Sequence, residues 1–377
     1  MTAEKQTVLF VAPLNRNLRE FEEFERQFDC IFYKLTTRKA FLSDLQTDPK
    51  LKKIAGIYCG FSGFHAIGGL EDDEIIDALP YTLKIIAVCS AGFNGYNLTK
   101  LRQRGIDFCN TPNYGAPQVA EVALYHIICG FRQFPVFTEA LHEKKDTIES
   151  RLQLQEYTKF DKEKGIYSKI TDKQELSEID PWFAFGEKLS RNRIVTSPLG
   201  KVITIVGFGH IGKELGTRVH ALGMKVRYVA KHRLLEDEEK RLGYPLEFYE
   251  DIRHAAVGSE YCMVLCLPKT PQTVGILNKE VINSLNDNCC IVNVGRGGLI
   301  IEDDLLEGLK SGKVRYAGLD VLEDEPKVKP ELLSRQDVCI TPHIGSCTEE
   351  VFDHTARFCL QNMSCRLDGG VSRSIQN

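Results

Sequence analysis

A glycine-rich turn, Gly207-Phe208-Gly209-His210-Ile211-Gly212, follows directly on the apolar run Val202–Val206. Beyond the turn, apolar residues recur every three or four positions from Ile211 to Leu222, which is the spacing of one helix face. A second strand-like run, Val226–Val229, comes next. A strand, a G-x-G-x-x-G turn, a helix and a second strand in this order are typical of a dinucleotide-binding unit, so the sequence predicts a parallel α/β sheet here.

Each glycine of this turn has a physical role in such a unit. Gly207 allows the tight turn, Gly209 lets the backbone approach a pyrophosphate, and Gly212 allows the helix to pack closely on the strand. His210 and Ile211 begin the helix, whose amino end faces the phosphates. We therefore predict cofactor contacts at all five positions; an ordinary βα turn is the simpler alternative.

The end of the second strand predicts which dinucleotide binds. NAD-binding units carry an acidic residue there, which accepts hydrogen bonds from the ribose hydroxyls. This chain has Ala230-Lys231-His232-Arg233 instead. No carboxylate is present to repel a 2′-phosphate, and Lys231 and Arg233 can pair with one. We predict that NADP(H) is preferred over NAD(H), with contacts at Lys231, His232 and Arg233, unless these are merely surface charges.

The rest of the chain predicts two α/β domains. A chain of 377 residues favours two domains of about 150 residues each. Strand-like and helix-like stretches alternate from residue 8 to 110 and again from 201 to 340. Between these regions we expect a long helix, Pro117–Phe134, and a segment at about 143–180 in which 18 of 38 residues are charged. We interpret that segment as a solvated insertion or a loosely ordered arm, and a partner-binding segment is the alternative.

Near the end of the chain, Ser346-x-x-Glu349 has the spacing of a capping box. It predicts that a final helix begins there and continues towards Leu367.

Charge and hydropathy exclude several functional classes. Forty-eight basic and 52 acidic residues leave a formal charge of −4. A chain without excess positive charge is not expected to bind nucleic acid or an anionic membrane by electrostatic attraction. There is no apolar run of 18 residues and no secretory signal in residues 1–7. The 13 cysteines show neither C-x-x-C nor zinc-finger spacing, so we expect reduced, mostly buried thiols and no metal. A cytoplasmic protein is the expectation.

Three further stretches follow predicted strands and carry chemically useful groups. The first places Arg296 between glycines, where a guanidinium suits a substrate carboxylate. The second is the acidic loop Leu319–Pro326, and the third is Thr341–Gly345 with its single histidine. Reduction of a 2-oxo acid needs a cation for the carboxylate and a positioned acid to protonate the carbonyl oxygen. Taken singly, the acidic loop could be a solvated turn and the histidine structural.

With these motifs the sequence resembles the D-2-hydroxyacid dehydrogenases over nearly all of the chain except the charged insertion. The resemblance implies that Arg296 binds the substrate carboxylate and carbonyl, that His343 is the acid/base, and that Glu325 supports His343. It also implies that the backbone amides of Ala91 and Gly92, in Ser90–Asn94, meet the substrate carboxylate. The other cofactor contacts that it implies are Leu267, Pro268, Thr270, Val294, Gly295 and, for the nicotinamide carboxamide, Asp320.

The resemblance also implies an α/β fold of two Rossmann-like or flavodoxin-like domains with parallel sheets and an active site in the cleft between them. The substrate domain would comprise residues 1–115 and 346–377, and the dinucleotide-binding domain would comprise 116–345. Members usually form homodimers through an arm of the cofactor domain, close to the charged insertion. This chain lacks the acidic residue that binds the ribose hydroxyls, and in this respect it resembles the glyoxylate and hydroxypyruvate reductases that use NADPH.

We therefore predict an NADP(H)-dependent oxidoreductase that reduces a small 2-oxo acid of the glyoxylate or hydroxypyruvate type to the D-2-hydroxy acid. The alternative is a dinucleotide-sensing binding protein, like the corepressor branch of the same family. Oxidation of phosphite or formate is a third possibility, but no distinct residue set indicates it. Phe61 and Phe64 either narrow the substrate pocket or belong to the core.

Overall fold

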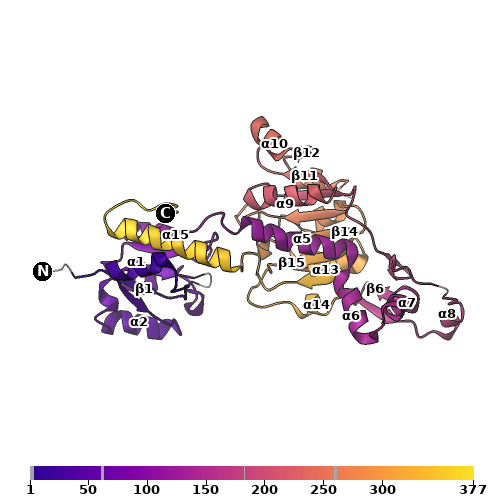
Figure 1. Ribbon diagram of the computed structural model, residues 1–377, viewed down its shortest axis with the longest axis horizontal. Coiled ribbons are helices and arrows are strands. Elements are labelled where there is room, and N and C mark those ends of the chain that lie inside the picture. Colours follow the sequence, from indigo (N-terminus) through magenta and orange to yellow (C-terminus); the bar gives the residue numbers. More distant parts are fainter. Residues whose placement is uncertain (1–3, 61–62, 182, 259–260) are drawn as a thin grey trace. The chain divides into compact units, whose positions relative to one another are not determined.

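The computed structural model describes residues 4–60, 63–181, 183–258 and 261–377. The chain divides into two compact units, one comprising Met1–Gly115 and Cys347–Asn377 and the other comprising Ala116–Ser346. Each unit is built on its own parallel sheet with helices on both faces (Figure 1). This confirms the predicted α/β class.

The first unit has a five-stranded sheet in the order β2-β1-β3-β4-β5. This is the flavodoxin-like order, in which the direction of winding reverses between β1 and β3. Its strands are β1 Thr7–Phe10, β2 Asp29–Phe32, β3 Ile54–Cys59, β4 Ile85–Val88 and β5 Asp107–Cys109.

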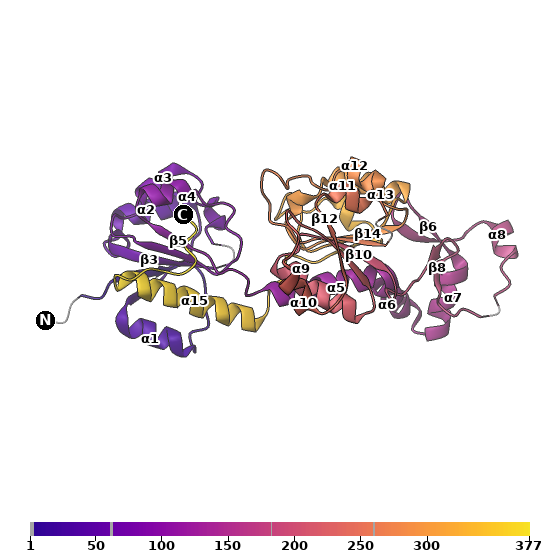
Figure 2. The same ribbon diagram turned by 90° about the horizontal axis from the view of Figure 1, so that it is seen from above.

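Figure 2 shows how the helices of this unit cover its sheet. One face packs on α1 and α15, and the other on α2, α3 and α4. The helices are α1 Arg19–Gln27, α2 Arg38–Thr47, α3 Asp73–Ala78, α4 Leu98–Gln103 and α15 Glu349–Leu367, with the short 3-10 turns η1 Leu51–Lys53 and η2 His65–Ile67.

The second unit has a seven-stranded parallel sheet in the order β12-β11-β10-β13-β14-β15-β16. Its central strands are almost wholly apolar, as in β10 with the sequence VITIV, because both faces of a parallel sheet are buried. The strands are β10 Val202–Val206, β11 Lys225–Val229, β12 Leu246–Tyr249, β13 Cys262–Leu265, β14 Cys289–Asn293, β15 Val314–Leu319 and β16 Val338–Ile340.

Two groups of helices cover this second sheet (Figure 2). α5 and α9 pack on one face, and α11, α12 and α13 pack on the other. The bounds are α5 Ala116–Arg132, α9 His210–Ala221, α10 Glu236–Leu242, α11 Ile252–Ala256, α12 Lys279–Ser284, η3 Gly297–Leu299, α13 Glu302–Ser311 and α14 Pro330–Leu333.

The charged segment at 143–180 forms helices and short strands with few buried residues of its own, so of the two predicted forms it is a solvated insertion and not a loosely ordered arm. Buried residues anchor it, because Arg335 donates hydrogen bonds to the backbone oxygens of Lys162 and Glu163 at 2.8 and 3.0 Å and pairs with Asp337 at 2.9 Å. The elements of this region are α6 Phe134–Lys144, α7 Thr147–Tyr157, β6 Thr158–Asp161, β7 Ile166–Lys169, α8 Lys173–Ser177, β8 Lys188–Ser190 and β9 Arg193–Ile194.

Two predicted helix boundaries also differ from the structure. The helix expected over Pro117–Phe134 ends at Arg132, because Gln133 takes the left-handed conformation (φ 53°) before α6 begins. The cap of the last helix is Thr348, whose side chain accepts from the Val351 backbone N–H, and not Ser346. Over the described ranges, no helix has the length and apolar character needed to cross a membrane.

Candidate active site

The predicted cofactor and catalytic motifs of the second unit lie at one edge of its sheet. The glycine turn follows β10, Leu267 follows β13, Arg296 follows β14, Asp320 follows β15 and His343 follows β16. These five strands are consecutive neighbours in the sheet, and all are parallel. Their carboxyl ends therefore share the edge at which α/β sheets bind ligands.

The glycine turn has the geometry that a bound pyrophosphate needs. Gly207 has a φ of 93°, and a Cβ there would lie 2.8 Å from the Leu267 side chain. A Cβ at Gly212 would lie only 2.4 Å from the Gly207 carbonyl oxygen, so the helix packs tightly on the turn. A Cβ at Gly209 would meet nothing within 4 Å, which means that the backbone there faces open space.

The amino end of α9 completes this cradle. Gly209 is its N-cap and supplies no side-chain hydrogen bond, and His210 is exposed. The first backbone N–H groups of the helix, from His210 and Ile211 onward, and its dipole can therefore hold an anion. These residues fit the pyrophosphate of a dinucleotide.

The three basic residues after β11, Lys231, His232 and Arg233, are exposed but not equivalent. Arg233 forms two hydrogen bonds with the carboxylate of Glu239, at 3.0 and 3.2 Å, and this pairing lowers the pKa of Glu239. Lys231 forms no ion pair within the described part of the chain. Lys231 is therefore directly available to a 2′-phosphate, whereas Arg233 has to exchange an exposed ion pair, which contributes little to stability.

The loop after β13 lies between the glycine turn and the arginine loop. The Leu267 side chain lies next to Gly207, where it would contact an added Cβ. The Leu267 carbonyl oxygen lies next to Gly295, 2.6 Å from where a Cβ would be. Thr273, which sequence reasoning missed, shapes this loop by accepting from the Thr270 N–H and donating to the Pro268 carbonyl, both at 2.7 Å.

Short-range contacts hold Arg296 at the edge. Asn293, buried at the end of β14, donates to the Arg296 carbonyl at 2.9 Å and accepts from the Gly295 N–H at 3.1 Å. A Cβ at Gly297 would lie 1.8 Å from the Leu322 carbonyl oxygen, so glycine is required where this loop meets the acidic loop. Burial lowers the pKa of Arg296, and the nearby charge of Glu325 opposes that effect. Val294, by contrast, has its side chain in the core.

His343 and Glu325 form a direct pair. Nδ1 of His343 lies 2.7 Å from Oε2 of Glu325, and Oε1 of Glu325 accepts from the Leu322 N–H at 2.8 Å. Burial raises the pKa of Glu325, but the hydrogen bond with His343 and further contacts outweigh it and lower the pKa overall. The imidazole is thus oriented by a carboxylate and stays 28% exposed.

Asp320 positions the loop that carries His343. Its carboxylate, 2% exposed, accepts hydrogen bonds from the Thr341 hydroxyl at 2.6 Å and from the N–H groups of Ile344 and Gly345, both at 2.9 Å. Since that hydroxyl donates to Asp320, it accepts from Nε2 of His126, 3.0 Å away. Burial lowers the pKa of His126 to about 4, so its ring is neutral. The contact of Asp320 with a carboxamide stays a prediction.

The loop Ser90–Asn94 of the first unit follows β4 and is held through its carbonyl groups. The Ser90 hydroxyl donates to the Gly92 carbonyl, and the Asn110 amide donates to the Ala91 carbonyl, both at 2.8 Å. The backbone N–H groups of Ala91 and Gly92 find no acceptor among the residues that the structure describes. Two adjacent donors are therefore available, and their contact with a substrate carboxylate stays a prediction.

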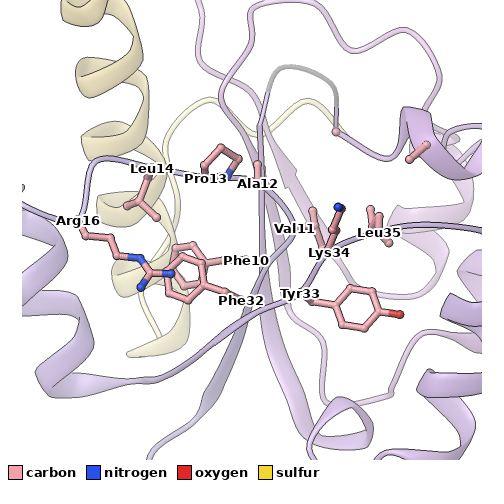
Figure 3. Close-up of a pocket in the computed structure, with 12 residues that line it drawn as sticks. Phe10, Val11, Ala12, Pro13, Leu14, Arg16, Phe32, Tyr33, Lys34 and Leu35 are labelled. Atoms are coloured by element: carbon pink, nitrogen blue, oxygen red, sulfur yellow. The ribbon is translucent and has the colours of Figure 1, made fainter.

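A groove of about 530 Å³ lies at the carboxyl ends of β1 and β2 in the first unit. In Figure 3, Arg16 lies beside the rings of Phe10 and Phe32, and its guanidinium carbon is 3.7 Å from the centre of the Phe32 ring.

Phe64 belongs to the core and is 1% exposed, so the core interpretation is correct for it. Phe61 lies outside the described residues. No group of three or more metal-ligating side chains occurs in the described ranges.

Comparisons with known proteins identify relatives of this chain. Residues 172–345 match the family model for the D-isomer specific 2-hydroxyacid dehydrogenase, NAD binding domain. A hydroxypyruvate reductase of Thermotoga maritima is 33% identical over 281 residues, which cover 74% of this chain and 75% of that protein. A glyoxylate/hydroxypyruvate reductase of Arabidopsis thaliana is 28% identical over 291 residues, covering 77% and 75%. The structure of D-mandelate dehydrogenase from Rhodotorula graminis superimposes with a TM-score of 0.80 and 27% identity, covering 99% and 98%.

Proposed function

The chain belongs to the D-isomer specific 2-hydroxyacid dehydrogenase family, and we propose that it reduces a small 2-oxo acid of the glyoxylate or hydroxypyruvate type to the D-2-hydroxy acid with NADPH. One observation carries the proposal. Arg296 and the Glu325–His343 pair lie at the same sheet edge as a glycine turn shaped for a pyrophosphate.

The reaction divides among these residues. A bound nicotinamide supplies the hydride that reaches the carbonyl carbon. The Arg296 guanidinium holds the substrate carboxylate with two parallel hydrogen bonds, which fixes the carbonyl in place. His343 donates a proton to the carbonyl oxygen as negative charge builds on it, and Glu325 stabilises the protonated imidazole and its orientation. Asp320 keeps the loop of His343 in position.

A panel of 2-oxo acids assayed with NADPH tests the function. We expect the purified protein to oxidise NADPH with glyoxylate or hydroxypyruvate and to form the D product from hydroxypyruvate. A chain that binds NADPH but turns over no acid of the panel contradicts the proposal. That result would favour the dinucleotide-sensing alternative.

The preference for NADPH is proposed to depend mainly on Lys231. Changing Lys231 to glutamate should lower kcat/KM for NADPH by about 10²-fold, because a charge-assisted bond worth about 1.5–3 kcal/mol is replaced by repulsion. The value for NADH should change little. Lys240→Glu is the matched control, since Lys240 pairs with Glu236 on α10. A wild-type enzyme with higher kcat/KM for NADH than for NADPH would contradict the preference itself.

We also propose the homodimer that the family resemblance implies. Phe134 on α6 is 45% exposed and lines a groove of about 550 Å³ together with Tyr125 and His142. Leu141 on the same helix is 39% exposed. Apolar exposure of this kind supports a subunit contact.

The cytoplasmic location stays a prediction.

A further inference from the structure

Two cysteines distant in sequence lie against each other in the first unit. Cys89 directly follows β4, and Cys359 lies on α15, which packs over β3 and β4. Their Sγ atoms are 3.6 Å apart. A disulfide requires about 2.05 Å between the sulfurs, so closing the bond needs a movement of about 1.5 Å shared by the two side chains.

The surroundings of the two thiols differ. The Cys89 Sγ also lies 3.0 Å from the Tyr58 hydroxyl and remains partly exposed, whereas Cys359 is 1% exposed. Burial raises the pKa of Cys89, but hydrogen bonds from Cys359 and Tyr58 outweigh it, so the pKa of Cys89 is lowered. Burial and the neighbouring Cys89 raise the pKa of Cys359. Cys89 is the better nucleophile, and Cys359 keeps its proton.

We propose that Cys89 and Cys359 form a redox modification site, at which a hydroperoxide oxidises Cys89 and Cys359 then closes a disulfide. In the first step the Cys89 thiolate attacks the O–O bond of hydrogen peroxide, which gives a sulfenic acid and, after protonation, water. In the second step Cys359 attacks the Cys89 sulfur and displaces a second water. Two thiols are oxidised and one peroxide is reduced.

The order of these steps follows from the contacts. In the structure the Cys89 thiol donates to Sγ of Cys359, and once ionised Cys89 raises the pKa of Cys359, so that this thiol keeps its proton. Oxidation of Cys89 removes the negative charge, and with it two of the causes that raise the pKa of Cys359. Burial, the largest of those causes, remains, so the more exposed Cys89 is oxidised first and the buried Cys359 reacts with the sulfenic acid that lies against it.

The disulfide would displace the loop proposed to bind the substrate carboxylate, and this consequence rests on the proposed function. Cys89 immediately precedes Ser90–Asn94, and its own N–H donates to the Cys59 carbonyl at 3.0 Å. Thr111 connects the same regions, because its N–H donates to the Ser90 carbonyl at 2.9 Å and its hydroxyl lies 3.6 Å from Sγ of Cys359. We therefore expect that a disulfide at Cys89, the residue before this loop, shifts the start of the loop.

Peptide mapping of the full-length protein after treatment with hydrogen peroxide tests the site. Alkylation without reduction should show a Cys89–Cys359 disulfide that dithiothreitol reverses, both in the wild type and in Cys365→Ser, which lacks an exposed thiol on α15. Cys359→Ser should instead accumulate a dimedone-reactive sulfenic acid at Cys89. Cys89→Ser should keep Cys359 reduced.

The readouts separate this site from the proposed function. If Cys89 and Cys359 stay reduced while other thiols are oxidised, or if Cys359 oxidises equally fast in Cys89→Ser, the modification site is refuted whether or not the protein is active. If the disulfide forms, KM for the 2-oxo acid should rise about tenfold, equivalent to about 1.4 kcal/mol. An unchanged KM in the oxidised enzyme would overturn the effect on the loop.

Discussion

Replacing His343 by alanine is expected to lower kcat for every active 2-oxo acid by about 10²-fold or more, because the carbonyl oxygen then loses its positioned proton donor. KM should change much less, since Arg296 still holds the carboxylate. Steady-state kinetics with NADPH measure both. Glu325→Gln keeps the shape of the pair but removes the charge next to Nδ1, so it should give a smaller fall in kcat.

His254→Ala is the matched control for that experiment. His254 is exposed on α11 and forms no part of the proposed site, so its loss should leave kcat unchanged. Near-normal kcat in His343→Ala with all active substrates would exclude this histidine as the acid. Thermal unfolding of each variant checks that a lost activity is not a lost fold.

Replacing Arg296 by alanine should mainly raise KM for the 2-oxo acid, by about 10²-fold. Hydrogen bonds between a guanidinium and a carboxylate are worth about 1.5–3 kcal/mol, and each 1.4 kcal/mol is a factor of ten. Arg296→Lys keeps a cation but loses the planar pair of donors, so an intermediate KM is expected. KM for NADPH should stay close to the wild-type value.

Arg253→Ala is the corresponding control, because Arg253 is a surface residue on α11 whose partner, Glu280, is also exposed. If KM for the 2-oxo acid is the same in Arg296→Ala as in this control, Arg296 does not bind the substrate. Loss of kcat without any change in KM would also contradict the assigned role, since it would place the interaction in the transition state alone.

The strands and the glycine turn could be predicted because their signals are local. The run Val202–Val206 became β10 with the predicted bounds, and the run Val338–Ile340 became β16. A central strand such as β10, which is covered on both faces, has to be apolar throughout, so its composition alone reveals it. The segment at 143–180 could not be predicted in this way. Its many charges suggested loose order, yet Arg335, far along the chain, binds its backbone.

The residue types needed for the chemistry were therefore visible in the amino-acid sequence: the glycines at 207–212, Arg296, Glu325 and His343. Which of them meet depends on strand order, since β14, β15 and β16 become neighbours only in the folded sheet. The support of the His343 loop by Asp320 and the contact between Cys89 and Cys359, 270 positions apart, have no sequence signal. Periodicity reports that a residue is buried, but only the tertiary structure decides which partner it is buried against.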